Sequence, residues 1–228
     1  MVKPTVILFD IDGTLLLSGG AGRRAMERAC GEILGMPDAC ASFSMAGMTD
    51  RAIVRRACQA AGRPDHPALL DQLLEAYLCA LPEELARSTR FRILAGGHRL
   101  IAALREHGHV AVGLGTGNVR RGAAHKLGHA GLWNVTHFGG FGCDAEDRGE
   151  LIRIGAERGA RSLGRPLGEC RVVVVGDTLF DVRAAAVNGF VSLAIATGAT
   201  SREELSAGGA DWAVGSLEEP GILEFLLG

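Results

Sequence analysis

The sequence predicts an α/β protein with a doubly wound, Rossmann-like parallel sheet and an inserted α-helical domain. Short apolar runs rich in β-branched residues alternate with helical patterns along most of the chain, as expected for strands that are buried on both faces and joined by helices. Residues 15–92 interrupt this alternation with helical patterns and no convincing strand. We therefore predict a core formed by residues 1–14 and 93–228 and a helical cap formed by residues 15–92.

Each expected strand is a short, nearly continuous apolar run. These runs are Thr5–Phe9, Val110–Leu114, Val172–Val175 and Val191–Ala196. The expected helices of the core have apolar residues on a helical period or an alanine-rich composition. They are Gly96–His107, Arg148–Leu163, Phe180–Asn188 and a short helix that a capping box opens at Ser201 to Glu204.

The interval after the first strand has only helical periodicity. Its expected helices are Gly22–Leu34, Asp50–Ala61 and Pro67–Leu81, flanked by Ser18–Gly20 and Arg90–Ile93. A helical insertion placed directly after the first strand is the simplest account of this pattern.

Composition limits the classes of function. The chain has 228 residues, a formal charge of −2 and 47% hydrophobic residues, which gives no electrostatic footprint for nucleic acid or an acidic membrane surface. No stretch approaches the length of a membrane span, and the N-terminal apolar run is too short for a secretion signal. The six cysteines form no CxxC pair, which favours reduced thiols in a cytoplasmic protein. Because the net charge is close to zero, an anionic substrate must be attracted by a local group of charges rather than by the protein as a whole.

Two acids close the first strand, in the segment Phe9-Asp10-Ile11-Asp12-Gly13-Thr14. Residues two apart in an extended chain project to the same side, so the two carboxylates converge. Such proximity is costly unless a cation or a shared proton relieves it. A strand that simply ends in solvated acids and a glycine turn is the alternative. Ligand sites in doubly wound sheets lie at this end of the strands, which favours a functional pair.

Polar residues also close two later strands. Gly115-Thr116-Gly117-Asn118 supplies a hydroxyl and backbone N–H groups suited to an anion, although the same residues are ordinary in turns. Gly176-Asp177-Thr178-Leu179-Phe180-Asp181 supplies two acids, suited to a hard divalent cation, although Asp181 also suits a helix N-terminus. The coincidence of these features at separate strand ends is more informative than any one of them.

With these motifs in this order, the sequence resembles the haloacid dehalogenase-like hydrolase superfamily, and within it phosphoglycolate phosphatase and similar small-molecule phosphatases. The motifs that carry the resemblance are Asp10-Ile11-Asp12-Gly13-Thr14, Thr116 and Gly176-Asp177 through Asp181. The insertion at 15–92 is similar to the helical cap of that family, so the resemblance spans the chain.

The resemblance implies a Mg²⁺-dependent phosphatase that acts on a small phosphorylated metabolite. Asp10 would attack phosphorus and form an aspartyl-phosphate, and Asp12 would act as the general acid and base. Mg²⁺ would bind Asp10, the carbonyl of Asp12 and Asp177, with Asp181 orienting these ligands. Thr116 would hold a phosphoryl oxygen, next to the backbone of Gly117 and Asn118. Neither the physiological substrate nor the oligomeric state has a signature in the sequence.

One element departs from the family pattern, which normally places a lysine before the helix that leads to the last catalytic strand. Asp147-Arg148 occupies about that position, so Arg148 is the first candidate for the phosphate-binding cation. Lys126 is the second candidate, because only Lys3 and Lys126 are lysines. Lys126 lies about 12 Å of helical rise from the start of its helix, and this distance predicts a solvated lysine away from the site. The cap residue Arg51 is a further candidate for substrate binding, against the alternative of a surface arginine.

Related activities differ in what they require. A dehalogenase would not need Asp12 or Asp177, and a phosphonate-cleaving relative would need a cap lysine, which residues 15–92 do not contain. A phosphomutase that acts on a sugar phosphate shares every core residue and stays open. A non-catalytic binding protein on the same scaffold also stays open, since the expected lysine is missing.

Overall fold

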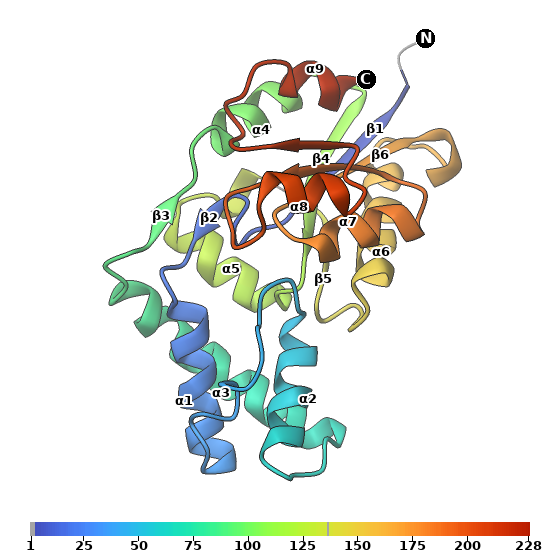
Figure 1. Cartoon of the computed structure of the whole chain (residues 1–228). Coiled ribbons are helices and arrows are strands. Elements are labelled where there is room, and N and C mark those ends of the chain that lie inside the picture. The colour runs from blue at the N-terminus through green and yellow to red at the C-terminus, as the bar shows by residue number, and fades with distance from the viewer. Residues whose placement is uncertain (1–2, 136) are drawn as a thin grey trace.

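The computed structural model describes residues 3–135 and 137–228, and in these residues six parallel strands form the central sheet, in the order β5-β4-β1-β6-β7-β8 (Figure 1). The strands are β1 (Thr5–Phe9), β4 (Val110–Thr116), β5 (Gly139–Phe141), β6 (Arg171–Gly176), β7 (Val191–Ile195) and β8 (Trp212–Val214). The central strand β1 pairs with β4 on one side and β6 on the other. The predicted fold class is confirmed. The prediction missed β5 and β8, which are only three residues long.

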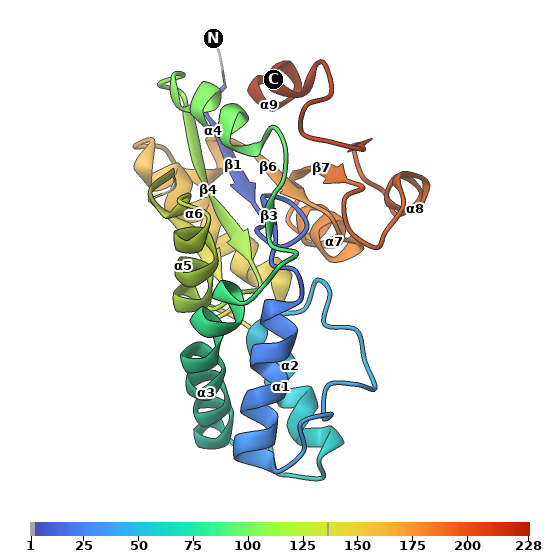
Figure 2. The same ribbon diagram turned by 90° about the vertical axis from the view of Figure 1, so that its left-hand side faces the viewer.

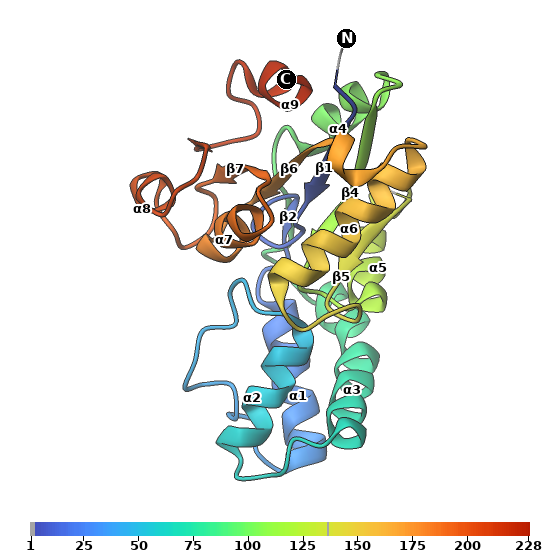
Figure 3. The same cartoon turned by 90° about the vertical axis from the view of Figure 1, so that its right-hand side faces the viewer.

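Helices cover both faces of the sheet, as Figures 2 and 3 show. One face packs against α4 (Gly97–Arg105), α5 (Arg120–His129) and α9 (Ile222–Leu227). The other face packs against α6 (Arg148–Ser162) and α7 (Leu179–Val187), with α8 (Arg202–Ala207) beside α7. Along β1 the side chains alternate between the two cores: Ile7 and Phe9 face the first, and Val6 and Leu8 face the second.

The inserted segment forms the helices α1 (Ala21–Leu34), α2 (Asp50–Ala60) and α3 (Pro67–Ala86), which share a hydrophobic core of their own and lie below the carboxyl edge of the sheet in Figure 1. At the base of the insertion, β2 (Leu16–Leu17) and β3 (Arg92–Ile93) pair antiparallel. The expectation that residues 15–92 contain no strand is therefore wrong at its two ends. A two-residue strand is too short to show an alternating pattern.

Helix α3 continues past the end predicted for it at Leu81, through Pro82 to Ala86. Proline removes a helical hydrogen bond and usually stops or bends a helix. Here the last turn is held by tertiary contacts: Leu85 is buried, and the carboxylate of Glu84 accepts a hydrogen bond from Arg24 Nε at 2.8 Å. Packing thus outweighs the local preference.

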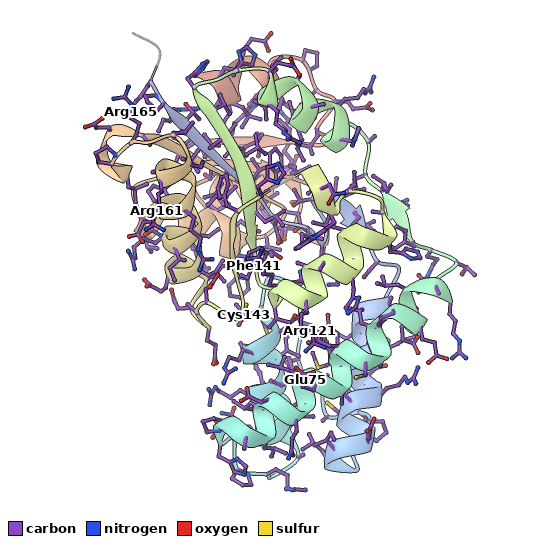
Figure 4. The ribbon with its side chains drawn as sticks, turned by 180° about the vertical axis from the view of Figure 1, so that it is seen from behind. Glu75, Arg121, Phe141, Cys143, Arg161 and Arg165 are labelled. Atoms are coloured by element: carbon purple, nitrogen blue, oxygen red, sulfur yellow. The ribbon has the colours of Figure 1, made fainter. Side chains whose placement is uncertain are left out.

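Polar contacts join the cap to the core around the carboxyl edge of the sheet. Arg121 of α5 donates to both carboxylate oxygens of Glu75 on α3, at 2.6 and 2.7 Å (Figure 4). Arg55 of α2 pairs with Glu146, which precedes α6. Thr49, the N-cap of α2, donates its hydroxyl hydrogen to the carbonyl of Glu146. These bonds hold the helical insertion over the ends of the strands.

No helix in the described ranges has both the length and the apolar character needed to cross a membrane.

Candidate active site

The carboxyl ends of β1 and β6 bring Asp10 and Asp177 together. Asp10 directly follows β1, and its backbone N–H donates to the carbonyl of Val175 at 2.8 Å. The turn after Asp10 passes against Asp177, and there Gly13 has a φ of +81°. A Cβ at Gly13 would collide with the carboxylate of Asp177, so this position needs glycine both for its backbone conformation and for the close approach.

The carboxylates of Asp10, Asp177 and Asp181 form a buried acidic cluster, in which one oxygen of each lies within 4.8 Å of the others. Burial raises the pKa of Asp177 to about 8, and the charges of Asp10 and Asp181 add to this rise. Burial also raises the pKa of Asp10 to about 6, although the charge of Arg148 opposes it. Oδ1 of Asp177 is buried and has no hydrogen-bond partner among the described residues. These carboxylate oxygens fit a hard divalent cation.

Arg148, the first residue of α6, bridges two of these acids. Its Nη2 lies 3.0 Å from Asp10 Oδ2 and 2.6 Å from Asp181 Oδ1, and its Nη1 donates to the carbonyl of Gly47 in the cap. Burial alone would lower the pKa of Arg148, but the charges of Asp181 and Asp10 raise it. The structure therefore places Arg148 next to the nucleophile candidate Asp10, and its role as the phosphate-binding cation stays a prediction.

Asp181 has contacts on both of its oxygens. Oδ1 accepts from Arg148, and Oδ2 accepts from the backbone and hydroxyl of Thr178, which completes a capping box at the start of α7. Asp181 thus serves as the helix-start acid considered above and also orients Arg148.

Lys126 lies in the site, so the expectation of a solvated lysine away from it is wrong. Lys126 is 5% exposed, and its Nζ donates to Asp12 Oδ2 and to Asn118 Oδ1, each at 2.6 Å. Helical side chains lean back toward the helix N-terminus, so the long stem of Lys126 carries its ammonium group toward the start of α5, where it meets Asn118 and Asp12. Burial alone would lower the pKa of Lys126, but attraction to Asp12 and other neighbours raises it.

Thr116 ends β4 but is fully buried. Its hydroxyl accepts from Asn118 Nδ2 at 2.9 Å, and the same Nδ2 donates to Asp12 Oδ2 at 2.9 Å. Among the described residues, Gly117 and Asn118 line the cavity of the site, whereas Thr116 does not. Asn118, rather than Thr116, is therefore the polar side chain of this strand end that lines the cavity, and both N–H groups of its amide are already bonded within the protein.

A cavity of about 400 Å³ lies between the strand ends and the cap. Asp10, Asp12, Lys126, Arg148 and Asp177 line its core side.

On the cap side, the cavity is lined by residues that the sequence did not single out, among them Asp50 and Tyr77. Arg51 is not among the described residues that line the cavity; its Nη1 instead pairs with Asp71 Oδ1 of α3 at 3.0 Å. The expectation that Arg51 faces the substrate is corrected accordingly. Asp50 and Arg51 are neighbours on a helix, so they point in different directions, and the acid takes the inward one.

The parallel sheet, the acidic cluster at its carboxyl edge and the helical cap above it define a capped α/β enzyme with an aspartate-centred site. The profile of the haloacid dehalogenase-like hydrolases matches residues 4–189 of the chain. The chain therefore belongs to this hydrolase family, which confirms the resemblance drawn from the motifs.

Solved structures with the same fold cover nearly the whole chain. A predicted phosphatase from Clostridium acetobutylicum has a TM-score of 0.70 at 17% identity and covers 100% of this chain and 99% of its own. A predicted phosphoglycolate phosphatase from Haemophilus somnus has a TM-score of 0.69 at 15% identity, with 98% and 97% covered. CbbY from Rhodobacter sphaeroides, in complex with phosphate, has a TM-score of 0.69 at 19% identity, with 97% of each chain covered. No curated protein matches the sequence.

Proposed function

We propose that this hydrolase is a Mg²⁺-dependent phosphatase that cleaves a small phosphorylated metabolite through an aspartyl-phosphate on Asp10. The observation that carries the proposal is the position of Asp10: a buried carboxylate at a strand end, held at Oδ2 by Arg148 and grouped with Asp177 and Asp181 at a cavity that also contains Lys126. The phosphatase descriptions of proteins with the same fold support it.

The acidic cluster fits Mg²⁺ by its donor chemistry. Asp10, Asp177 and Asp181 offer oxygen ligands, and Oδ1 of Asp177 has no other described partner. Mg²⁺ accepts one or two carboxylates together with waters and substrate oxygens. We assign Asp10 and Asp177 as its direct ligands, with the carbonyl of Asp12, because Arg148 and Thr178 already occupy Asp181. When bound, the ion would offset the charge of the phosphoryl group next to the carboxylates.

Arg148 and Lys126 have the remaining roles in the proposed reaction, which are to position the nucleophile and to bind the phosphoryl group. Arg148 fixes the orientation of Asp10, so that the carboxylate is held in place for attack. Lys126 also lines the cavity, and its third N–H, which Asp12 and Asn118 leave free, can bind a phosphoryl oxygen. In phosphoryl transfer the protein mainly positions the groups and offsets their charge, and this arrangement does both.

We assign the proton transfers to Asp12. Its side chain is 39% exposed, and its Oδ2 accepts from Lys126 and Asn118. In the first step Asp12 gives a proton to the leaving oxygen, and the resulting carboxylate is stabilised by Lys126. In the second step Asp12 takes a proton from the water that attacks the aspartyl-phosphate, which releases inorganic phosphate and restores Asp10.

The test is phosphate release from a generic aryl phosphate and from a panel of phosphorylated metabolites, with and without Mg²⁺, for the wild type and Asp10→Asn. We expect release that needs Mg²⁺ and is lost in the variant, while Asp38→Asn, a change of an exposed cap acid, keeps it. Acid quenching during turnover should leave one phosphoryl group on the wild-type chain. Comparable turnover by Asp10→Asn would contradict the proposal. Conversion of a sugar phosphate to its isomer without phosphate release would identify a phosphomutase instead.

A further inference from the structure

At the wall of the cavity, the cap places a tyrosine hydroxyl that has no protein partner within the described residues, and its oxygen is not fully buried. Tyr77 of α3 is 1% exposed and lines the cavity, and its hydroxyl makes no hydrogen bond to any described residue. Burying a polar group without a hydrogen bond costs free energy. A hydroxyl that stays unpaired at the wall of a binding cavity therefore indicates a ligand that completes its hydrogen bonding.

Asp50, at the start of α2, provides a second polar group on the same wall. Its backbone N–H donates to the carbonyl of Gly117, and its Oδ2 accepts from the N–H of Val119, both at 2.8 Å, so the carboxylate is fixed against the core. Burial raises the pKa of Asp50 to about 6, with the charge of Lys126 opposing this rise. Near neutral pH the group is therefore mainly a carboxylate and a hydrogen-bond acceptor.

Asp50 has no ion-pair partner within the described ranges. The ammonium of Lys126 is close enough to influence Asp50, but its hydrogen bonds go to Asp12 and Asn118. The acceptor capacity that Asp50 has beyond the bond from Val119 is therefore available to a ligand in the cavity.

The two side chains approach the same point on α5. A Cβ at Gly122 would lie 3.4 Å from Asp50 Oδ2 and 3.6 Å from Tyr77 Oη. Gly122 is one helical turn before Lys126, so the pair lies beside the cation that we assign to the phosphoryl group. The missing side chain at Gly122 leaves room between the two oxygens. A leaving group that extends from a phosphoryl group at Lys126 toward the cap meets this pair.

We propose that Asp50 and Tyr77 bind a neutral hydroxyl group of the leaving group, so that the substrate is the phosphate monoester of a polyol or a sugar. This inference rests on the proposed phosphatase function. A hydroxyl can donate to the carboxylate of Asp50 and accept from the hydroxyl of Tyr77, which can act as donor or acceptor.

Charged leaving groups suit the pair less well. A carboxylate, as in phosphoglycolate, is repelled by Asp50. An ammonium group is attracted by Asp50 but repelled by the nearby Lys126, and it has no acceptor for the hydroxyl hydrogen of Tyr77. The cap arginine that lines the cavity, Arg23, is half-exposed and lies 3.7 Å from Glu27, so it does not form a buried carboxylate site.

The experiment compares substrates that differ only in hydroxyl groups. The values of kcat/KM for glycerol 3-phosphate and glucose 6-phosphate are measured against those for propyl phosphate and tetrahydropyran-2-ylmethyl phosphate, their hydroxyl-free counterparts. Phosphoglycolate and aminoethyl phosphate test the two charged alternatives, and an aryl phosphate reports phosphatase activity as such. The wild type, Tyr77→Phe and Asp50→Asn are measured with saturating Mg²⁺.

We expect the wild type to prefer at least one hydroxylated ester over its counterpart by about tenfold or more, as sites that hydrogen-bond a substrate hydroxyl discriminate strongly against analogues that lack it. Tyr77→Phe should reduce this ratio about threefold to tenfold, the size of one neutral hydrogen bond, and Asp50→Asn should reduce it further. Because the hydroxyl of Tyr77 has no partner in the protein, Tyr77→Phe should leave the unfolding temperature unchanged or raise it. A purely structural role predicts the opposite: lower stability and an unchanged ratio.

The outcomes separate the two proposals. If the wild type cleaves none of the esters, including the aryl phosphate, the phosphatase function fails. If it cleaves the aryl phosphate but prefers phosphoglycolate, aminoethyl phosphate or the hydroxyl-free esters, the hydroxyl site is refuted and the phosphatase function stands. An unchanged preference in Tyr77→Phe and Asp50→Asn also refutes the hydroxyl site.

Discussion

Replacing Lys126 by methionine tests the assignment of the phosphate-binding cation most directly. Methionine keeps a long, flexible, apolar stem in the buried space and removes only the charge and its donors. An ammonium group has three N–H donors, and two of those on Lys126 are engaged, by Asp12 and Asn118 at 2.6 Å each. The remaining donor is the one available to a phosphoryl oxygen.

The expected losses of activity and of stability in Lys126→Met follow from the surroundings of the ammonium group. Removing one preorganised donor from a site of developing charge lowers kcat about 10²- to 10³-fold, or about 2.7–4 kcal/mol. The stability loss should be smaller, about 1–3 kcal/mol, because the side chain of Asp12 is 39% exposed and water can replace the lost bonds. Arg148→Met leaves Asp10 and Asp181 unpaired, with side chains only 7% and 3% exposed, so its stability loss should reach about 3–5 kcal/mol.

The assay is steady-state phosphate release from the aryl phosphate, with denaturant unfolding of the same samples. Lys3→Met is the matched control, because it changes the other lysine of the chain, which is exposed, and it should behave as the wild type. If Lys126→Met retained kcat within about threefold of the wild type, a loss far below that of one such donor, Lys126 would not contact the transferring group. Arg148 alone would then be the cation, as the family pattern first indicated.

Two further predictions concern the metal site and the cap. The raised pKa of Asp177, about 8 against an ordinary value of 3.8, means that the folded metal-free protein binds this proton more tightly than the unfolded chain does. The stability of the metal-free protein should therefore fall as pH rises from about 4 to about 8. Added Mg²⁺ should raise the unfolding temperature, measured by thermal unfolding, more at pH 8 than at pH 6. A larger effect of Mg²⁺ at pH 6 would contradict this prediction. A Cβ at Gly117 would collide with the carbonyl of Met48 in the cap, so Gly117→Ala should cost about 1–3 kcal/mol and lower turnover. The control is Gly128→Ala, at an exposed helical site with open space, which should gain about 0.5–1 kcal/mol of stability. An equal loss of stability and turnover in both variants would show that the contact between Gly117 and the cap does not matter.

The sequence was sufficient for the parts of the site that depend on strand ends. The apolar run before Asp10 defines a buried parallel strand, and a parallel sheet brings all carboxyl ends to one edge. The convergence of Asp10 and Asp177 therefore follows from pattern alone, and the structure shows it. The strand-end pattern also drew attention to Asp181, as a second acid or as a helix-start acid, and its place beside the metal ligands was implied by the resemblance. In the structure Asp181 caps α7 and also lies in the acidic cluster.

The parts that depend on helix orientation could not be read in this way. Whether Lys126 faces the site depends on the direction of α5 and on a side chain that reaches back along it, neither of which is set by spacing. Asp50 and Tyr77 belong to different cap helices, and only the packing of the cap on the core brings them to one wall. The signal available for Asp50 was its position after Thr49, the N-cap of α2, and the prediction used the neighbouring Arg51 instead.

We propose that two cations, Arg148 and Lys126, divide the work of the missing family lysine. A lysine beside the nucleophile has to hold the carboxylate and bind the phosphoryl group with one ammonium. In this chain Arg148, with its five donors in a planar fork, bonds to Asp10, Asp181 and the carbonyl of Gly47 at once. A guanidinium engaged in this way is well suited to fixing the nucleophile and poorly suited to following a moving phosphoryl group. Lys126, which is held by Asp12 and Asn118, supplies a second charge with one N–H donor to spare. On this proposal, the arginine in the usual lysine position holds the nucleophile, the lysine on α5 binds the phosphoryl group, and neither replaces the family lysine alone.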